Sequence, residues 1–343
     1  MVIAMNNLTP DNYQSLKEQI KTLLGEGRRK AIASVNTLLV RTYWHIGKHI
    51  VEFEQNGETK AAYGKELLTK LSKDLTLEYG KGFSRSNLTY MRKLYLAFPK
   101  RETLSHRLSW SHYFEILKSD DPLELNFYLK ECEKENWSVR ELKRQMKSML
   151  FHRLALSKDK KGVLELSQKG NSVVVADDVV KDPYVFEFLG IEQDHRYLEG
   201  ELEAKLIQNL EKFLLELGKG FAFVGRQYKI NIGSRHFFVD LVFYHRILKC
   251  FVLIDLKRGE IEHNDIGQMN LYLNYFKKEE STEGDNEPIG IVLGAYKDHI
   301  LVEYATENIT NQLFVSKYQL YLPEKERLIE ELNKILGNAV PSN

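Results

Sequence analysis

The chain has 343 residues, of which 43% are hydrophobic and 28% are charged, so it can form two or three domains that each bury a core. No segment approaches the roughly 18 consecutive apolar residues of a membrane-spanning helix, and the N-terminus lacks the basic and apolar regions of a secretory signal. The two cysteines lie far apart, with no third metal ligand nearby. The sequence therefore indicates a cytoplasmic protein without a disulfide framework, a zinc site or a membrane span.

The net charge of +1 conceals a basic first half and an acidic second half. Through Lys161 the chain holds 29 Lys and Arg against 19 Asp and Glu, and the remainder holds 20 against 29. A basic half is what a phosphate-binding surface needs, although solvated helix faces also carry many lysines. The charge split therefore predicts that the first half contacts nucleic acid, with an ordinary solvated surface as the alternative.

The first domain, residues 1–155, is predicted to be helical because its apolar residues recur at helical spacing. Pro10 opens the first helix, where its missing N–H costs little. Ser84 caps a later helix, and Ser138 starts a capping box before a basic helix that reaches Arg153. The other predicted helices cover residues 28–53, 61–79 and 84–97, and a short one starts near Ser109 or Ser111.

Two of these helices, over residues 61–79 and 84–97, are joined by the turn Lys81-Gly82-Phe83. This pair resembles a helix-turn-helix, the second helix of which would enter the DNA major groove. Helix pairs with a glycine turn also occur in many bundles that never touch DNA, so simple packing is the alternative. The side chains that the second helix would present to nucleic acid are those of Arg85, Asn87, Arg92 and Lys93.

Residues 156–197 are charged and irregular, and we interpret them as a linker or a small bridging layer. The element order changes in residues 198–343, where helices alternate with β-branched, apolar runs. This order predicts an α/β domain with a mixed sheet flanked by helices, in a chain that is α+β overall. The expected elements are a helix over 198–217, strands over 221–232, 236–244 and 248–256, a helix over 264–276, the strand PIGIVLGA, a short helix, the strand LFVSKYQLYL and a closing helix from Pro323.

Three charged residues interrupt the apolar strands of this domain. Asp240 lies within one predicted strand, and Asp255 and Lys257 lie in the next. Residues two apart in a strand point to the same face, so Asp255 and Lys257 should share one face while Ile254 and Leu256 share the other. A hairpin can bring Asp240 beside them. Because buried charges are costly unless they pair or bind metal, the sequence predicts a site here.

Two carboxylates and a lysine are suited to phosphodiester chemistry. Hard oxygen ligands favour Mg²⁺ or Mn²⁺ over zinc. A metal held by carboxylates can orient a phosphate and lower the pKa of a water, and Lys257 can position that water or offset negative charge. The alternative is a buried Lys–Asp pair that only supports the fold, and the three residues alone do not decide between the two.

The order helix, strand, strand with Asp, strand with Asp-X-Lys, helix resembles the PD-(D/E)XK nuclease superfamily. Several blocks of sequence resemble more closely the YhcG-like family of bacterial nucleases, also called the DUF1016 group. The similarity runs from about Tyr13 to Leu336. The core motif is short, but the joint presence of the blocks is specific: LSWSHYFEIL, NFYLKECEKENWSVRELKRQ, KDPYVFEFLG, FLLELGKGFAFVGRQYKI, FFVDLVFYH and DLKRGEIEHNDIGQMNLYLN.

The resemblance implies a role for each position that matches the family motif. Asp240 and Asp255 match the acidic metal ligands, and the backbone carbonyl of Leu256 would complete the metal shell. Lys257 matches the signature lysine. The family more often has Glu where this chain has Asp255, a difference of one methylene that the superfamily accepts. Two further matches join the catalytic residues: Glu203, on the helix before the first strand, as another metal ligand, and Gln268, on the helix after the lysine strand, as a polar residue of the site.

The residues around this motif have plainer interpretations as well. Glu203 could belong to a solvated helix face, and Gln268 could pair with backbone. Arg226 and Gln227, in the strand next to the site, are expected to contact phosphate. Tyr272 follows Gln268 by one turn, and we expect it to pack in the core.

The sequence thus predicts a metal-dependent nuclease that hydrolyses DNA, with a basic helical domain that binds the nucleic acid. One alternative is a nuclease fold that binds DNA without turnover, and another is a helical half that binds a protein partner. RNA is an open alternative to DNA, because the basic half contains aromatic residues, although the chain has no RNA-specific fingerprint. Because one site per chain would have to cut two strands of a duplex, a homodimer is expected on geometric grounds.

Overall fold

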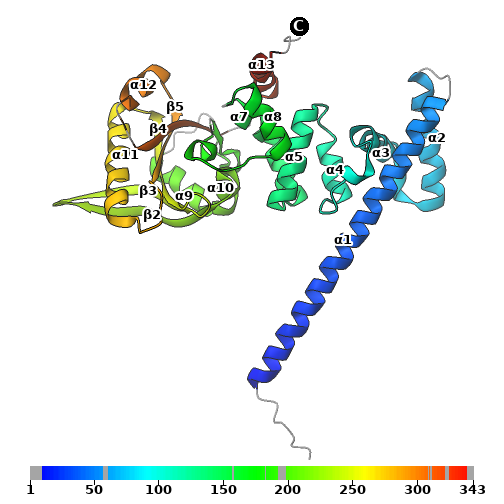
Figure 1. Cartoon of the computed structure of the whole chain (residues 1–343), viewed down its shortest axis with the longest axis horizontal. Coiled ribbons are helices and arrows are strands. Elements are labelled where there is room, and N and C mark those ends of the chain that lie inside the picture. The colour runs from blue at the N-terminus through cyan, green and yellow to red at the C-terminus, as the bar shows by residue number, and fades with distance from the viewer. Residues whose placement is uncertain are drawn as a thin grey trace, which may run out of the picture. The chain divides into compact units, whose positions relative to one another are not determined.

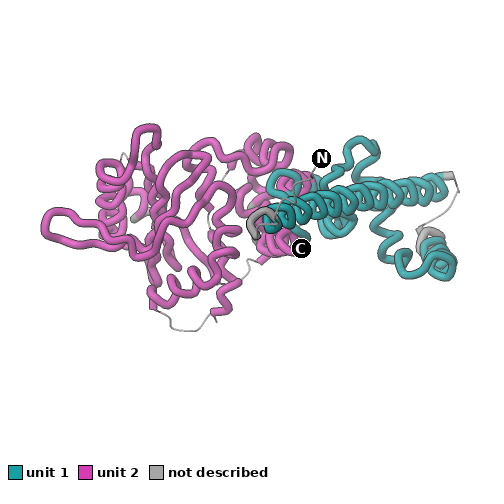
Figure 2. Tube along the Cα trace, turned by 90° about the horizontal axis from the view of Figure 1, so that it is seen from below, with its two compact units in different colours: residues 1–125, 132–139 teal, residues 126–131, 140–343 magenta. Residues whose placement is uncertain are grey.

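The computed structural model describes residues 10–56, 61–156, 158–181, 183–191, 198–307, 309, 311–320 and 324–337. The chain forms two compact units, shown in two colours in Figure 2. Unit 1 comprises residues 1–125 and 132–139, and unit 2 comprises residues 126–131 and 140–343. No helix in the described part of the chain is long and apolar enough to cross a membrane.

Unit 1 is built on one long helix, α1 (Pro10–Asn56). The sequence predicted two helices with a break before residue 28, and this was wrong, because α1 continues through Gly25 and Gly27. Each glycine costs a helix about 1 kcal/mol relative to alanine. In Figure 1 the N-terminal half of α1 (dark blue) extends away from the other helices of unit 1.

The C-terminal half of α1 packs against α3 (Arg85–Ala97). The two backbones approach so closely that a Cβ atom on Gly47 would lie 2.0 Å from the carbonyl oxygen of Met91, which only glycine permits. The indole of Trp44 donates a hydrogen bond to the carbonyl of Phe98 at 2.7 Å, where α3 ends. Between these helices lies a small apolar core around Ile50, Leu68, Leu88 and Met91.

The predicted helix–turn–helix pair is present, as α2 (Ala61–Tyr79), the 3₁₀ turn η1 (Lys81–Phe83) and α3. Gly80 ends α2 with a φ of 85°, a conformation in which glycine is free of Cβ strain. The hydroxyl of Ser84 accepts a hydrogen bond from the amide of Asn87 at 3.2 Å, which confirms the predicted cap.

Further helices follow, and two differ from prediction. The helix α5 (Pro122–Glu135) was not predicted, although Asp121 caps it and Pro122 occupies its first turn, both ordinary start signals. The basic helix expected to reach Arg153 is broken at Met149, which has a φ of 56°. The observed elements are the 3₁₀ turn η2 (Arg101–Thr103), α4 (Trp110–Ile116), α6 (Val139–Lys147) and α7 (Leu150–Ala155).

Unit 2 contains a six-stranded mixed sheet with the strand order β1-β6-β5-β4-β3-β2. The pairs β2–β3 and β3–β4 are antiparallel, whereas the pairs β4–β5, β5–β6 and β6–β1 are parallel. This confirms the predicted mixed sheet and the predicted succession of the strands β2 to β6 along the chain, whereas β1 was not predicted. The bounds are β1 (Tyr184–Val185), β2 (Phe221–Ile232), β3 (Arg235–His245), β4 (Cys250–Glu260), β5 (Ile289–Tyr296) and β6 (Gln312–Gln319).

Helices cover both faces of the sheet, as Figure 1 shows. The helices α9 (Glu199–Gln208) and α10 (Leu210–Leu217) pack on one face. They were predicted as one helix, but Asn209 separates them. On the other face, α11 (His263–Tyr275) lies so close to β5 that a Cβ atom on Gly290 would be 2.7 Å from the side chain of Met269. The π turn η5 (Phe276–Glu280) extends α11, and α12 (His299–Thr306) and α13 (Lys325–Leu336) complete the unit.

The segment interpreted as a linker or bridging layer contains a helix and a strand of unit 2. The helix α8 (Lys160–Lys169) is followed by the short turns η3 (Ala176–Val179) and η4 (Glu187–Leu189), and β1 pairs with β6 at the edge of the sheet. Unit 2 thus extends N-terminal to this segment without a break as far as Arg140, and it also includes residues 126–131.

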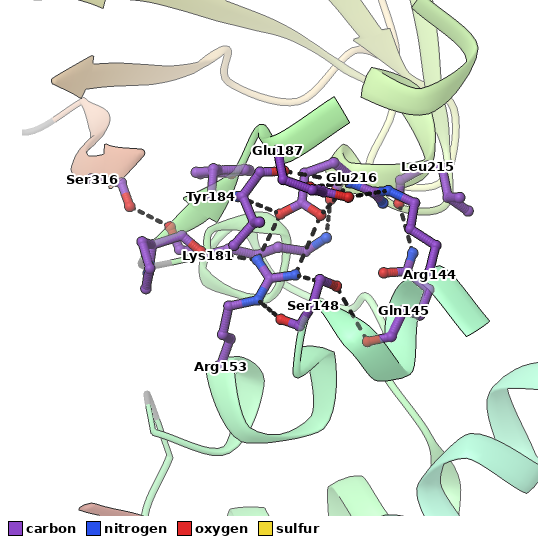
Figure 3. Close-up of polar contacts among 12 residues, drawn as sticks. Arg144, Gln145, Ser148, Arg153, Lys181, Tyr184, Glu187, Leu215, Glu216 and Ser316 are labelled. Carbon is purple, nitrogen blue, oxygen red and sulfur yellow. Dashed lines mark hydrogen bonds and ion pairs between the residues drawn. The ribbon is translucent and has the colours of Figure 1, made fainter. Parts of the chain in front are cut away.

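A buried ionic cluster joins these parts of unit 2 (Figure 3). Its centre is the carboxylate of Glu216 on α10, which is fully buried and lies 2.6 Å from Nη1 of Arg153 on α7. Arg144 on α6 is 3.4 Å from the same carboxylate, and Lys181 donates to the carbonyl of Glu216. The backbone amide of Val185 in β1 donates to Glu216 Oε1 at 3.0 Å. One carboxylate therefore ties α6, α7 and β1 to the helix that covers the sheet.

Candidate active site

The candidate catalytic residues lie where two central strands part. Backbone pairing between β3 and β4 runs from His245 and Cys250 to Leu241 and Ile254. Beyond that point β3 continues beside β2 alone, as far as the turn at Gly233. The next residues along the two strands are Asp240 and Asp255. We call this point, where β3 and β4 separate, the fork. In place of a backbone bond, the amide of Leu256 donates to Asp240 Oδ2 at 2.8 Å.

The carboxyl group of Asp255 is buried on the face of the sheet that α11 covers, with 3% of the residue exposed. Burial raises the pKa of Asp255 to about 7, repulsion from Asp240 adds to this, and Lys257 opposes it. Lys257 Nζ lies 2.9 Å from Asp255 Oδ2 as an ion pair, but that oxygen has no aligned hydrogen-bond donor among the described residues. The predicted proximity of Asp255 and Lys257 on one face, opposite Ile254 and Leu256, is confirmed.

Lys257 is held among several acidic side chains. Its Nζ is also 3.5 Å from Asp265 Oδ1 on α11. Burial would lower the pKa of Lys257, but the carboxylates of Asp255, Asp265 and Glu199 outweigh it and raise that pKa above its ordinary value. Asp265 and Glu199 were not predicted for the site, because each lies on a helix rather than in the motif and has no spacing signal. The lysine therefore carries a full positive charge at neutral pH.

Gln227 connects two of the predicted acids. Its side-chain amide donates to Glu203 Oε2 at 2.6 Å and to Asp240 Oδ1 at 3.0 Å. Glu203 on α9 is buried, with 6% of the residue exposed. Burial raises the pKa of Glu203, the hydrogen bond from Gln227 lowers it, and Asp240 raises it. The structure thus brings Glu203 to Asp240 through Gln227.

The backbone of Gln227 is unusual for a strand. Its φ is 47°, although its neighbours Arg226 and Tyr228 pair regularly with Leu241 and Val239 of β3. A left-handed conformation at a residue other than glycine costs about 1–3 kcal/mol and is retained where the surroundings impose it. Gln227 lies opposite Asp240 in the neighbouring strand, and its side chain contacts that same residue.

The other residues predicted for this site are arranged around it. Gln268 on α11 donates to the hydroxyl of Tyr272, which donates to the carbonyl of Phe238 at 3.1 Å. Tyr272 is fully buried, which confirms that it packs in the core. Arg226 is exposed on β2, and its charge lowers the pKa of Glu203. Gln268 is therefore linked to β3 through one tyrosine.

The four residues predicted to read DNA lie on α3 in unit 1. Arg92 Nε is 2.7 Å from Glu54 Oε2, and Lys93 Nζ is 2.9 Å from Asp120 Oδ1. Asn87 donates its side-chain amide to the carbonyl of Gly82 at 3.0 Å, which supports the turn. Arg85 is exposed at the start of the helix. Three of the four side chains thus have partners within unit 1.

The donor set at the fork fits a hard divalent cation. The carboxylates of Asp240 and Asp255 repel each other, and Oδ2 of Asp255 is paired only with the Lys257 ammonium group, so a divalent cation between the carboxylates would stabilise them. Within the part of the chain that the structure describes, no three His, Cys, Asp or Glu side chains form a ready-made metal cluster. Two carboxylates with backbone and water oxygens are enough for Mg²⁺, which usually retains several waters.

Comparisons with protein families divide the chain into two matches. Residues 19–153 match the DUF1016 N-terminal domain, and residues 177–334 match the YhcG PDDEXK nuclease domain. The chain is 38% identical over 356 aligned positions to YhcG of Escherichia coli (strain K12), which is described as a candidate nuclease, and the alignment covers 94% of each protein.

Among solved structures, the chain is similar to a repair endonuclease from Pyrococcus abyssi, with 20% identity, a TM-score of 0.27 and 38% of this chain covered. A complex of EndoMS with dsDNA has the same identity and TM-score, with 39% of this chain covered. The chain spans about half the length of each of these proteins, 50% in both cases.

Proposed function

The chain belongs to the YhcG family of PDDEXK nucleases, and we propose that it hydrolyses DNA phosphodiester bonds with Mg²⁺ or Mn²⁺ at the fork between β3 and β4. The observation that carries this proposal is the buried Asp255, which faces Asp240 and has Lys257 beside it. Nucleases of this type generally depend on divalent metals. The family match and the chemistry of the donor set therefore support the same reaction.

Asp240, Asp255 and the backbone carbonyl of Leu256 would hold the metal. When bound, a divalent cation would polarise the phosphate and make a water more acidic. The amide of Leu256 donates a hydrogen bond to one oxygen of Asp240. This bond fixes the orientation of the carboxylate and therefore the direction of the lone pairs that remain for a metal. Gln227 fixes the other oxygen and links it to Glu203, so Glu203 would act from the outer shell of the site.

Lys257 would act as a hydrogen-bond donor and a positive charge. Because the neighbouring carboxylates keep the pKa of Lys257 above its ordinary value, its ammonium group has no free lone pair to serve as a general base. It can orient the attacking water and offset the charge that develops on the phosphate. The leaving oxygen would take its proton from solvent.

The direct test is cleavage of labelled linear, branched and single-stranded DNA, and of RNA, with Mg²⁺, with Mn²⁺ and with EDTA. We expect cutting with either metal and none with EDTA, and the preferred substrate identifies the shape that the chain recognises. If all substrates bind equally with and without metal and none is cut, the alternative of a nuclease fold that only binds DNA takes precedence. Binding through the basic first half would weaken steeply as salt rises.

We predict that Gln227 positions Asp240 and that its strained backbone is retained for this purpose. Replacing Gln227 with glycine relieves the positive φ, worth about 1 kcal/mol, but it removes two hydrogen bonds, one of them to the buried Glu203. Because an unpaired buried acceptor costs about 1–3 kcal/mol, folding stability should not rise. Mn²⁺ affinity and cleavage should both fall about 10–100-fold, the usual effect of losing an outer-shell partner. Urea unfolding and calorimetric Mn²⁺ titration measure the two effects separately.

Lys249 offers a matched control for Gln227. It also has a positive φ, of 51°, in the turn before β4, and its side chain is exposed. Lys249→Gly relieves the positive φ without removing a side-chain hydrogen bond at the site, so it should raise stability by about 1 kcal/mol and leave Mn²⁺ affinity unchanged. A Gln227→Gly chain that binds Mn²⁺ and cuts DNA like the wild type would show that Gln227 has no positioning role.

A further inference from the structure

The N-terminal half of α1 carries an apolar stripe that the rest of unit 1 leaves uncovered. Apolar residues recur along it at spacings of three and four, the pattern of one helix face. The first buried residue of α1 is Val40, and Thr37 makes the first hydrogen bond to another element, to the carbonyl of His106 at 3.3 Å. The exposed large residues are Tyr13, Leu16, Ile20, Leu23, Leu24, Ile32, Val35, Leu38 and Leu39.

A helix of this kind is not stable by itself in water. Most helical stability in proteins comes from packing of an apolar face, and Gly25 and Gly27 weaken this segment further. The stripe is large, with Leu23 68% and Leu24 58% exposed. Contiguous exposed apolar surface of this size generally marks an interaction site.

We propose that a second copy of this chain covers the stripe, with the two α1 helices antiparallel and their two-fold axis between Leu23 and Leu24. In that register, residue i of one copy faces residue 47 − i of the other. Ile20 then faces Gly27, Leu16 faces Ala31 and Tyr13 faces Ser34. These three large side chains each meet a small one, and Leu23 meets Leu24 of the other copy at the two-fold axis, a pattern that lets closely packed helices interdigitate.

The length of the uncovered segment agrees with this register. Residue 10, the first of α1, faces residue 37, where the helix first contacts the rest of unit 1. The overlap therefore uses the free part of the helix and stops where unit 1 begins to cover it. It spans 28 residues of each helix, from residue 10 to residue 37.

The first test is the mass of the full chain in solution, by light scattering over a concentration series. We expect twice the mass of one chain, and the mass of one chain after Leu23→Glu/Leu24→Glu. Since both leucines are exposed in the single chain, this variant should keep the packed parts of both units folded and lose helix only in the uncovered half of α1, which circular dichroism and urea unfolding check. Leu77→Glu is the control. Leu77 on α2 is 90% exposed and lies outside the stripe, so the Leu77→Glu protein should have the same mass in solution as the wild type.

The second test is specific for the register. A Cβ atom on Gly27 would have no neighbour within 4 Å in the single chain, so Gly27→Leu should strengthen an isolated helix yet disrupt the pair by opposing Ile20. Adding Ile20→Ala to Gly27→Leu should restore the dimer, since large and small residues only exchange places. A wild-type chain that is monomeric, or a dimer that persists in Leu23→Glu/Leu24→Glu, would overturn the proposal, and so would capture of the stripe by a different protein alone.

Discussion

Replacing Asp240 with asparagine, or Lys257 with methionine, is expected to reduce metal-dependent DNA cleavage by about 10²–10³-fold or more. Asp240→Asn removes one of the two facing carboxylates and keeps the shape of the side chain. Lys257→Met keeps most of the side-chain volume and removes the positive charge beside Asp255. Cleavage of the preferred substrate with Mg²⁺ and with Mn²⁺ measures both effects.

The two variants should differ in metal binding. Asp240→Asn should weaken Mn²⁺ binding, because a neutral amide oxygen is a poorer ligand for a hard cation than a carboxylate. Lys257→Met should bind Mn²⁺ at least as well as the wild type, because it removes a cation that competes for Asp255. Lys278→Met and Glu283→Gln alter exposed charges away from the fork and serve as controls. Full activity in Lys257→Met would contradict the role assigned to the lysine.

Most of the fold could be predicted because the local sequence patterns are strong. The three strands around the site were predicted within a few residues, because β-branched apolar runs and short turns define them. The shared face of Asp255 and Lys257 follows from the two-residue period of a strand. The partners of Asp240 could not be read in the same way. Its bonds to Gln227 and Leu256 depend on where β3 parts from β4.

The elements that were predicted wrongly have physical causes that override the local sequence pattern. Asn209 breaks the helix predicted over 198–217, and its side chain bonds the carbonyl of Lys205, the kind of competition that asparagine offers to helical bonds. Met149 takes a left-handed conformation with no local residue signal, so tertiary packing imposes it. Gln227 also takes a left-handed conformation that its residue type does not predict. There the side chain donates hydrogen bonds to Glu203 and Asp240, so the site imposes the conformation.

The second large expected effect concerns the buried cluster around Glu216. Replacing Arg153 with methionine should destabilise the protein by about 3–5 kcal/mol, the usual cost of leaving a buried charge without its partner. Arg153 is fully buried and bonds the carbonyl of Pro183 and the carbonyl of Ser148 as well as Glu216. The loss should therefore loosen β1 and α7 together. Urea unfolding of the full chain measures it.

A double-mutant cycle with Glu216→Gln separates the ion pair from simple loss of packing. If the charges matter to each other, the double variant should lose less stability than the sum of the two single variants. A surface pair such as Lys277 with Glu287, whose side chains are 49% and 46% exposed, should show little coupling. Additive losses at Arg153 and Glu216 would show that the pair contributes through shape alone.

The acid stability of the protein should report on the same carboxylate. Burial alone would raise the pKa of Glu216, but Arg153, Lys181 and Arg144 outweigh it and lower that pKa to about 2. A group with a lowered pKa in the folded state stabilises the protein above its unfolded value of 4.5. That contribution is lost as the pH falls from about 4.5 through 2. Unfolding followed over this range should therefore show a steep loss of stability in the wild type. The loss should be shallower in Glu216→Gln, which has no proton to take up at this position.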